Sequence, residues 1–254
     1  MKKFICLIVL LSCCGLMAQT RKNESVNDNN KFYFGVSVSP TIDWYAPWYA
    51  PAPSTKEFTL EREKVKAGFI AGINFDVNLI KSRMLYFSTG VLFRYLDGNL
   101  AFENSYDFNT SDTTYYTKKL PTVRTYKTMY IAIPTGIKFR TVPLKNCVFV
   151  GKIGLYHNFK INGTQSDSFE DSLNPQYNYT TKPDKSGASL FAEAGYFGLG
   201  FEYAFAPTVR ISAGVDYSCQ FNYFSVGEIN KNNVSQAYYK SIIHSLQIVV
   251  GVWF

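Results

Sequence analysis

The sequence is poor in charged residues, in cysteine and in histidine. Charged side chains make up 18% of its 254 residues, below the roughly 25% of ordinary soluble domains, while 46% of the residues are hydrophobic; this composition argues against a disordered chain. Five cysteines and two histidines are too few for a dense disulfide framework or a zinc centre. After the signal-like start described next, no long apolar run follows, so we expect no transmembrane helix.

The start of the chain has the pattern of a secretory signal peptide. Two lysines precede an apolar run at 4–11, and small residues lead to an exit near Ala18. We therefore expect residues 1–19 to be removed on export and residues 20–30 to form a polar tail. A lipobox-like stretch leaves a second interpretation open, in which Cys13 is lipidated.

The remainder of the chain is dominated by alternation of apolar and polar residues. Near the end, for example, Leu246 and Ile248 alternate with Ser245 and Gln247. Period-two alternation over about ten residues is the pattern of a strand with one apolar face. Eight such segments occur, at 32–39, 67–79, 85–95, 130–140, 149–159, 196–205, 209–220 and 245–254.

The links between these segments alternate between short and long. Short links lie at 81–84, 141–146 and 206–208, and long links at 43–64, 97–125, 161–185 and 225–239. Alternation alone does not separate a water-soluble barrel from a membrane barrel, but short links at one end and long links at the other favour the membrane barrel. We therefore predict that residues 31–254 form an all-β, eight-stranded antiparallel up-and-down transmembrane β-barrel with short periplasmic turns and long extracellular loops. Eight strands leave a narrow lumen that side chains fill, so no porin-like channel is expected.

One strand carries a family resemblance. Residues 130–134 (YIAIP) and 136–140 (GIKFR) resemble the Tyr-x-x-Ile-Pro…Lys-Tyr signature of PorT-like outer-membrane β-barrels of Bacteroidota, although that family often has Glu where Ala132 stands. The resemblance implies an eight-stranded barrel in the outer membrane, surrounded by its lipid and lipopolysaccharide. The founding member is linked to type IX protein secretion, and nothing in this sequence singles it out as that member. A structural, scaffolding or secretion-accessory role is what the resemblance implies.

The predicted last strand ends on an aromatic residue. Phe254 follows alternating apolar residues, in a strand that must pair with the first one to close the barrel. Such a terminal aromatic resembles the recognition signal of the barrel-assembly machinery, which we therefore expect as a partner during insertion.

The polar face of the strands carries a surplus of basic residues. The chain has 26 Lys and Arg against 19 Asp and Glu, and its basic residues are dispersed through the strands, so no nucleic-acid-binding surface is indicated. We interpret the lumen-facing charges as an internal salt-bridge network that plugs a narrow barrel, with an anion site or gate as the second interpretation. The candidate residues are Asp76, Arg94, Lys138, Lys152, Glu202, Arg210 and Asp216.

No catalytic or cofactor-binding arrangement is recognisable in the sequence. The two histidines, His157 and His244, both have the parity of the lipid-facing side, whereas the adjacent Ser245 points to the opposite face. The sequence has no phosphate-binding glycine loop or metal-ligand cluster, and Cys147 and Cys219 should stand too far apart for a disulfide. We therefore expect no catalysis, no cofactor and two free thiols.

The first long link contains a doubled Trp-Tyr-Ala-Pro unit. It predicts either an aromatic girdle at the membrane interface or a contact patch for a protein or glycan. The contact patch supports an alternative function as a surface receptor or adhesin. The aromatic residues of the unit are Trp44, Tyr45, Trp48 and Tyr49.

Two other long links contain a modification motif. The Asp-Thr-Thr stretch at Thr113 and the Asp-Ser-Leu stretch at Ser172 resemble the acceptor sites of periplasmic O-glycosylation in Bacteroidota. Both lie in predicted extracellular loops, where a hydroxyl group is accessible to a modifying enzyme.

Overall fold

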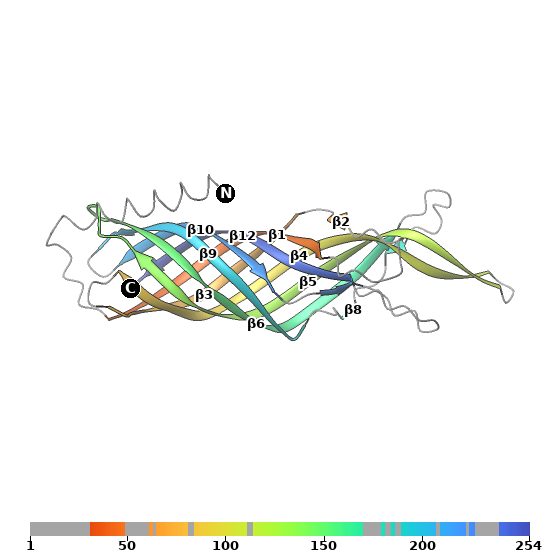
Figure 1. Ribbon diagram of the computed structural model, residues 1–254, viewed down its shortest axis with the longest axis horizontal. Coiled ribbons are helices and arrows are strands. Elements are labelled where there is room, and N and C mark those ends of the chain that lie inside the picture. The colour runs from red at the N-terminus through yellow and green to blue at the C-terminus, as the bar shows by residue number, and fades with distance from the viewer. Residues whose placement is uncertain are drawn as a thin grey trace.

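The chain forms a closed antiparallel barrel, which confirms the predicted fold (Figure 1). The computed structural model describes residues 31–48, 61–62, 65–80, 84–110, 114–169, 179–180, 184–185, 189–206, 209–221, 224–226 and 239–254. The predicted signal peptide (1–19) and polar tail (20–30) lie outside these residues. The eight barrel strands are β1 (Phe32–Trp48), β3 (Lys66–Asn78), β4 (Leu85–Thr110), β5 (Thr114–Arg140), β6 (Cys147–Phe169), β9 (Phe191–Ala204), β10 (Arg210–Gln220) and β12 (Tyr239–Trp253). Short strands pair with these at one end: β2 (Glu61–Arg62), β7 (Tyr179–Thr180), β8 (Asp184–Lys185) and β11 (Phe224–Val226).

Closure of the barrel depends on the pairing of β1 with β12. The two strands are in register from Gly35 opposite Trp253 to Trp48 opposite Lys240. Beyond β12, the backbone N–H of Phe254 donates to the carbonyl of Phe34 at 2.7 Å. Each of the eight barrel strands therefore has a neighbour on both sides, which leaves the barrel wall without an open edge.

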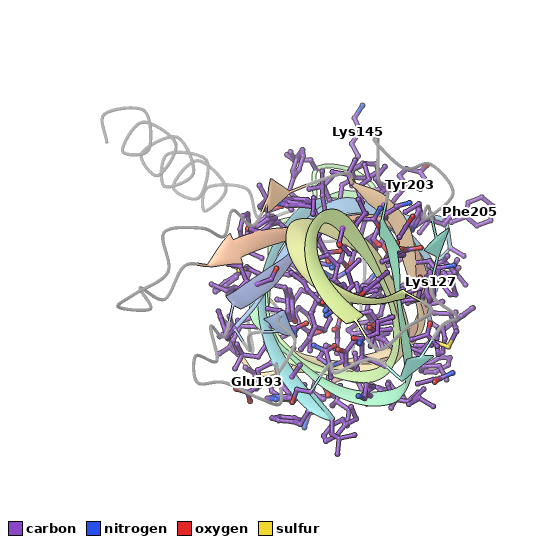
Figure 2. All side chains as sticks on the ribbon, turned by 90° about the vertical axis from the view of Figure 1, so that its right-hand side faces the viewer. Lys127, Lys145, Glu193, Tyr203 and Phe205 are labelled. Atoms are coloured by element: carbon purple, nitrogen blue, oxygen red, sulfur yellow. The ribbon has the colours of Figure 1, made fainter. Side chains whose placement is uncertain are left out.

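Successive residues of each strand point alternately into and out of the barrel. On β12, Ser245 and Gln247 are buried, whereas Leu246 and Ile248 are 39% and 56% exposed. Figure 2 looks along the barrel and shows Tyr203 pointing outward in the same way. Hydroxyl, amide and charged groups fill the interior, and apolar groups cover the exterior. A water-soluble barrel has the opposite distribution, so this exterior suits lipid.

The two ends of the barrel differ. At one end, which we call the turn end, short links are held by backbone hydrogen bonds between Leu79 and Leu85, Leu144 and Cys147, and Ala206 and Val209. At the other end, which we call the hairpin end, β4 and β5 project well beyond the barrel; Figure 1 draws them in yellow and green at the right.

The predicted loop at 97–125 is wrong, because the strands continue through it. β4 and β5 stay paired without interruption from Asp97 opposite Lys127 to Thr110 opposite Thr114. The apolar alternation on which the prediction relied stops near Tyr95, but Thr and Tyr residues beyond it retain high strand propensity. β6 likewise continues to Phe169, past the predicted start of the third long link, because it stays paired with the extended β5.

Candidate functional site

The interior of the turn end holds four ion-paired side chains, Asp76, Lys138, Glu202 and Arg140, which we call the interior charge chain. Lys138 Nζ lies 2.5 Å from Asp76 Oδ2 and 2.6 Å from Glu202 Oε1. Arg140 pairs with the other carboxylate oxygen of Glu202. All four side chains are buried. An unpaired buried charge costs free energy of folding, so the interior charge chain holds β3, β5 and β9 together across the lumen.

A second ion pair joins Lys152 to Asp216, with Nζ 2.8 Å from Oδ2. The register places Lys152 directly opposite Lys138 on the neighbouring strand, where two ammonium groups repel each other. The carboxylates that reach across from β3, β9 and β10 offset this repulsion. Gly198 makes room for one of them, because a Cβ atom at this position would lie 1.9 Å from Asp216 Oδ1.

The other two predicted members of the charge network are Arg94 and Arg210. Arg94 is fully buried nearer the hairpin end, where it donates to Ser218 Oγ at 2.9 Å and lies 5.3 Å from the centre of the Tyr156 ring. The Arg210 guanidinium lies 4.5 Å from the centre of the Tyr33 ring. Arg140 is a member that the candidate set omitted, although its lumen-facing parity was readable from the sequence.

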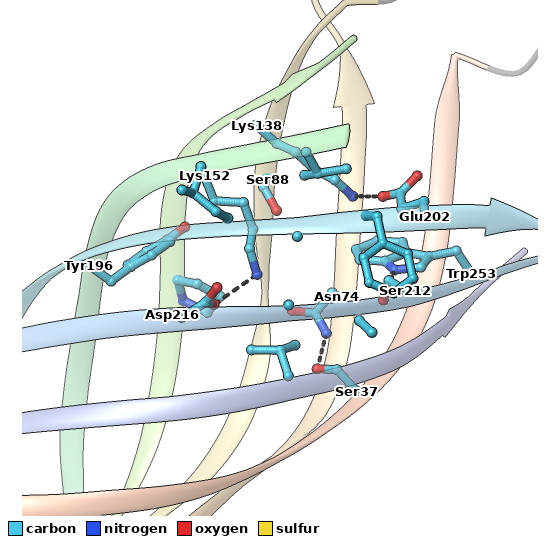
Figure 3. A pocket seen from close by; sticks show the side chains of 18 of the residues that line it. Ser37, Asn74, Ser88, Lys138, Lys152, Tyr196, Glu202, Ser212, Asp216 and Trp253 are labelled. Atoms are coloured by element: carbon cyan, nitrogen blue, oxygen red, sulfur yellow. Dashed lines mark hydrogen bonds and ion pairs between the residues drawn. The ribbon is translucent and has the colours of Figure 1, made fainter. Parts of the chain in front are cut away.

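A cavity of about 60 Å³ lies between the interior charge chain and the second ion pair (Figure 3). On its wall, Asn74 Nδ2 donates to Ser37 Oγ at 2.7 Å, and the Trp253 indole donates to Ser212 Oγ at 3.1 Å. The Trp253 ring also lies 3.9 Å from Lys138 Nζ. A cavity of this size holds a few water molecules, whereas organic ligands need about 300 Å³ or more.

Nearer the hairpin end, aromatic and aliphatic side chains close the lumen. The rings of Tyr45 and Tyr126 stack with centroids 5.4 Å apart. Gly98 is required beside them, because a Cβ atom there would lie 1.8 Å from the Tyr45 ring. We call the following buried residues the aromatic seal: Tyr45, Tyr126, Leu96, Leu100 and Ile243.

An Arg–Asp pair lies at the hairpin-end edge of the aromatic seal, where Arg124 is the cross-strand partner of Leu100, and outside the apolar band of the barrel. Arg124 Nε and Nη2 donate to the two oxygens of Asp167, its direct cross-strand partner, at 2.5 and 2.6 Å. Burial alone would lower the pKa of the Arg124 guanidinium, but the Asp167 carboxylate raises that pKa above its usual value. The pair therefore stays charged and links β5 to β6 at the base of the projecting hairpin.

The aromatic unit of the first long link does not form one patch. Trp44 and Tyr45 belong to β1 rather than to a loop, and they point to opposite faces. Trp44 stacks on His244 on the outer wall, with ring centroids 5.4 Å apart, as an aromatic girdle requires. Tyr45 is buried in the aromatic seal. Trp48 ends β1, and Tyr49 lies outside the described residues.

Both histidines lie on the outer wall and hydrogen-bond to side chains of neighbouring strands. His244 Nδ1 bonds to the Tyr217 hydroxyl. His157 lies between Thr135 and Glu193. The alternation of apolar and polar residues predicts the face of each histidine. It does not predict the hydrogen-bond partners, because these depend on strand register.

Several other predicted residues have simple outcomes. The thiols of Cys147 and Cys219 are free, as predicted. Thr113 and Ser172 lie outside the described residues. Among the residues that the structure describes, no three His, Cys, Asp or Glu side chains gather to hold a metal ion, and no helix is long and apolar enough to cross a membrane.

Several solved structures of bacterial proteins match this chain over most of its length at low identity. Neisserial surface protein A has a TM-score of 0.38 and 12% identity, over 88% of this chain and 96% of that one. Ail, the attachment invasion locus protein of Yersinia pestis, has a TM-score of 0.36 and 12% identity, over 89% of this chain and 100% of Ail. OprG of Pseudomonas aeruginosa has a TM-score of 0.36 and 10% identity, over 88% of this chain and 96% of OprG. At such low identity these likenesses concern the fold and not an activity.

A family model described as "Outer membrane protein beta-barrel domain" matches residues 17–218 of the chain. No curated protein sequence matches this chain.

Proposed function

We propose a structural, scaffolding or secretion-accessory role for this outer-membrane β-barrel. The chain belongs to the outer membrane protein beta-barrel domain family. We expect that it neither conducts solutes nor catalyses a reaction. The observation that carries this proposal is the filled lumen. The interior charge chain plugs the turn end, and the aromatic seal closes the lumen nearer the hairpin end. A barrel filled in this way suits a role as a membrane anchor.

The family resemblance of strand β5 supports a narrower form of the proposal. Residues 130–134 and 136–140 resemble the PorT-like signature of Bacteroidota, so a secretion-accessory role is the form that we favour. In this role the turn end faces the periplasm, the hairpin end faces outward, and the outer wall contacts lipid and lipopolysaccharide. The barrel-assembly machinery inserts the protein, with Phe254 in the terminal recognition signal.

The test combines conductance with partner capture. Purified protein in a planar bilayer should show no steady conductance, because the lumen is closed. Crosslinking in native membranes, followed by gentle extraction, should recover a stable membrane partner. A stable open channel in the bilayer, or a protein that is always recovered alone, would contradict the accessory role.

A surface receptor or adhesin is the second candidate function, and the projecting β4–β5 hairpin favours it (Figure 1). A hairpin that extends beyond the barrel lies away from the lipid, where a protein or glycan can reach it. Replacing residues 104–120 with Asn-Gly should shorten the hairpin and keep the barrel. Loss of binding of whole cells to a protein or glycan array would support the receptor, and unchanged binding would contradict it.

A further inference from the structure

The cavity between the interior charge chain and the second ion pair brings together basic and hydroxyl groups (Figure 3). Lys138 and Lys152 line it from the neighbouring strands β5 and β6. Hydroxyl groups line it from three other strands, at Ser37 on β1, Ser88 on β4 and Ser212 on β10. The closed barrel therefore gathers, in one small space, hydrogen-bond donors from distant parts of the chain.

The Lys152 ammonium group has N–H donors that the protein does not use. Its Nζ donates to Asp216 Oδ2 at 2.8 Å, and within the described part of the chain this is its one hydrogen bond. An ammonium group carries three N–H donors, so two remain. The side chain lines the cavity and is 24% exposed. These two donors therefore have the cavity to point into.

The serine hydroxyl groups of the cavity also have hydrogens to donate. Ser37 Oγ accepts from Asn74 Nδ2 at 2.7 Å, and Ser212 Oγ accepts from the Trp253 indole at 3.1 Å. An accepted bond uses a lone pair of the oxygen, so each hydroxyl hydrogen is left to rotate toward the cavity. The Ser88 hydroxyl has no hydrogen-bond partner among the residues that the structure describes.

The carboxylates of the cavity wall are engaged by the protein itself. Glu202 accepts from Lys138 and Arg140 through its two oxygens. Asp216 uses Oδ2 in the second ion pair, and its Oδ1 is buried against Gly198, where a Cβ atom would lie 1.9 Å away. The cavity therefore offers a ligand N–H and O–H donors and an ammonium charge. A water molecule must donate as well as accept, whereas an anion only accepts and matches such a lining.

We propose that this cavity binds a small inorganic anion of the size of chloride, with Lys152 as its charged ligand. The hydroxyl groups of Ser37, Ser88 and Ser212 complete the set of donors. A cavity of about 60 Å³ admits a monatomic ion and excludes organic anions, which need about 300 Å³ or more. The anion also reduces the repulsion between Lys138 and Lys152, which are direct cross-strand partners. Such a site goes beyond the proposed accessory role, because a membrane anchor does not require it.

The experiment follows the urea unfolding of the purified full-length protein in detergent, with chloride exchanged for gluconate at constant ionic strength. Gluconate is too large for the cavity and serves as the inert anion. We expect the folded-to-unfolded ratio of the wild type to rise about tenfold between roughly 1 and 100 mM chloride, which corresponds to a dissociation constant of about 10 mM. Ser88→Ala removes one donor and should reduce this rise to about twofold. Ser39→Ala, a buried lumen serine outside the cavity lining, is the matched control and should keep the full rise.

A second variant and a direct measurement separate a bound anion from screening of surface charges. Lys152→Met combined with Asp216→Leu removes the charged ligand together with its partner and should abolish the chloride dependence. Crystals of the wild type grown in bromide should show an anomalous scattering peak in the cavity. A wild type that does not respond to chloride, an equal response in the double variant, or bromide crystals with only water in the cavity would overturn the proposal. A bound anion does not open the aromatic seal, so each of these results leaves the accessory role untouched.

Discussion

The two halves of the lumen are filled by different chemistry. At the turn end, charged side chains pair across the barrel and leave a cavity of about 60 Å³. Nearer the hairpin end, Tyr, Leu and Ile side chains pack in the aromatic seal. Arg94 is held there by the Ser218 hydroxyl, the Asn158 amide oxygen and the Tyr156 ring. Ion pairs tolerate a water-filled gap, because each charge keeps its partner. A seal of stacked rings works only if it leaves no gap.

Breaking the interior charge chain should have the largest effect. Glu202→Gln leaves Lys138 and Arg140 buried beside a neutral group, and we expect a loss of about 3–5 kcal/mol in the free energy of unfolding. Urea titration, read as the loss of the fast-migrating folded band on unheated gels, measures it. Lys145→Ala, at an exposed turn position, is the control. A Glu202→Gln barrel as stable as the wild type would mean that the chain contributes little.

Opening the aromatic seal should cost somewhat less. Tyr45→Ala removes a buried ring that stacks on Tyr126, with an expected loss of about 3 kcal/mol. Because the ion pairs of the turn end leave a cavity of about 60 Å³, they are the weaker barrier, and the emptied space should also allow ion leakage in a planar bilayer. Trp44→Ala, at the adjacent outward position, should cause no leakage. Leakage from both variants, or from neither, would show that the seal is not the barrier.

A double-mutant cycle on Lys152 and Asp216 tests whether the second ion pair stabilises the turn-end half of the lumen. Lys152→Met alone leaves Asp216 as a buried charge without its ammonium partner, and Lys152 itself is 24% exposed, so we expect a loss of about 1–2 kcal/mol. Lys152→Met combined with Asp216→Leu should recover most of it, since the pair is removed together. The same urea titration applies. Additive losses would indicate that the two groups do not interact.

The smallest effect is expected from the projecting hairpin. In the described chain, residues 104–110 and 114–120 pair only with each other. Replacing 104–120 with Asn-Gly should therefore change the unfolding free energy of the barrel by less than about 0.5 kcal/mol. A loss similar to that of Glu202→Gln would mean that the extension supports the barrel wall.

Strand assignment from the sequence succeeded where lipid dictates the pattern and failed beyond it. Phe93 and Tyr95 continue an apolar outer face, and the predicted strand there is confirmed. From Asp97 onward the outer face carries no such requirement, and the hairpin was predicted as a loop. Trp44 and Tyr45 were assigned to a loop for the same reason, although β1 contains both.

The sequence by itself determined the number of barrel strands, the closure of the barrel and the face of each residue in the predicted strands. A period of two forces Lys138 inward and Phe139 outward wherever one face meets lipid. Only the tertiary structure decided the partners. Strand register sets Lys138 against Lys152, brings Glu202 across the lumen to both Lys138 and Arg140, and aligns His157 with Glu193. Register depends on backbone pairing between distant segments, and a one-residue slip, which alternation within one strand does not reveal, would replace every one of these contacts.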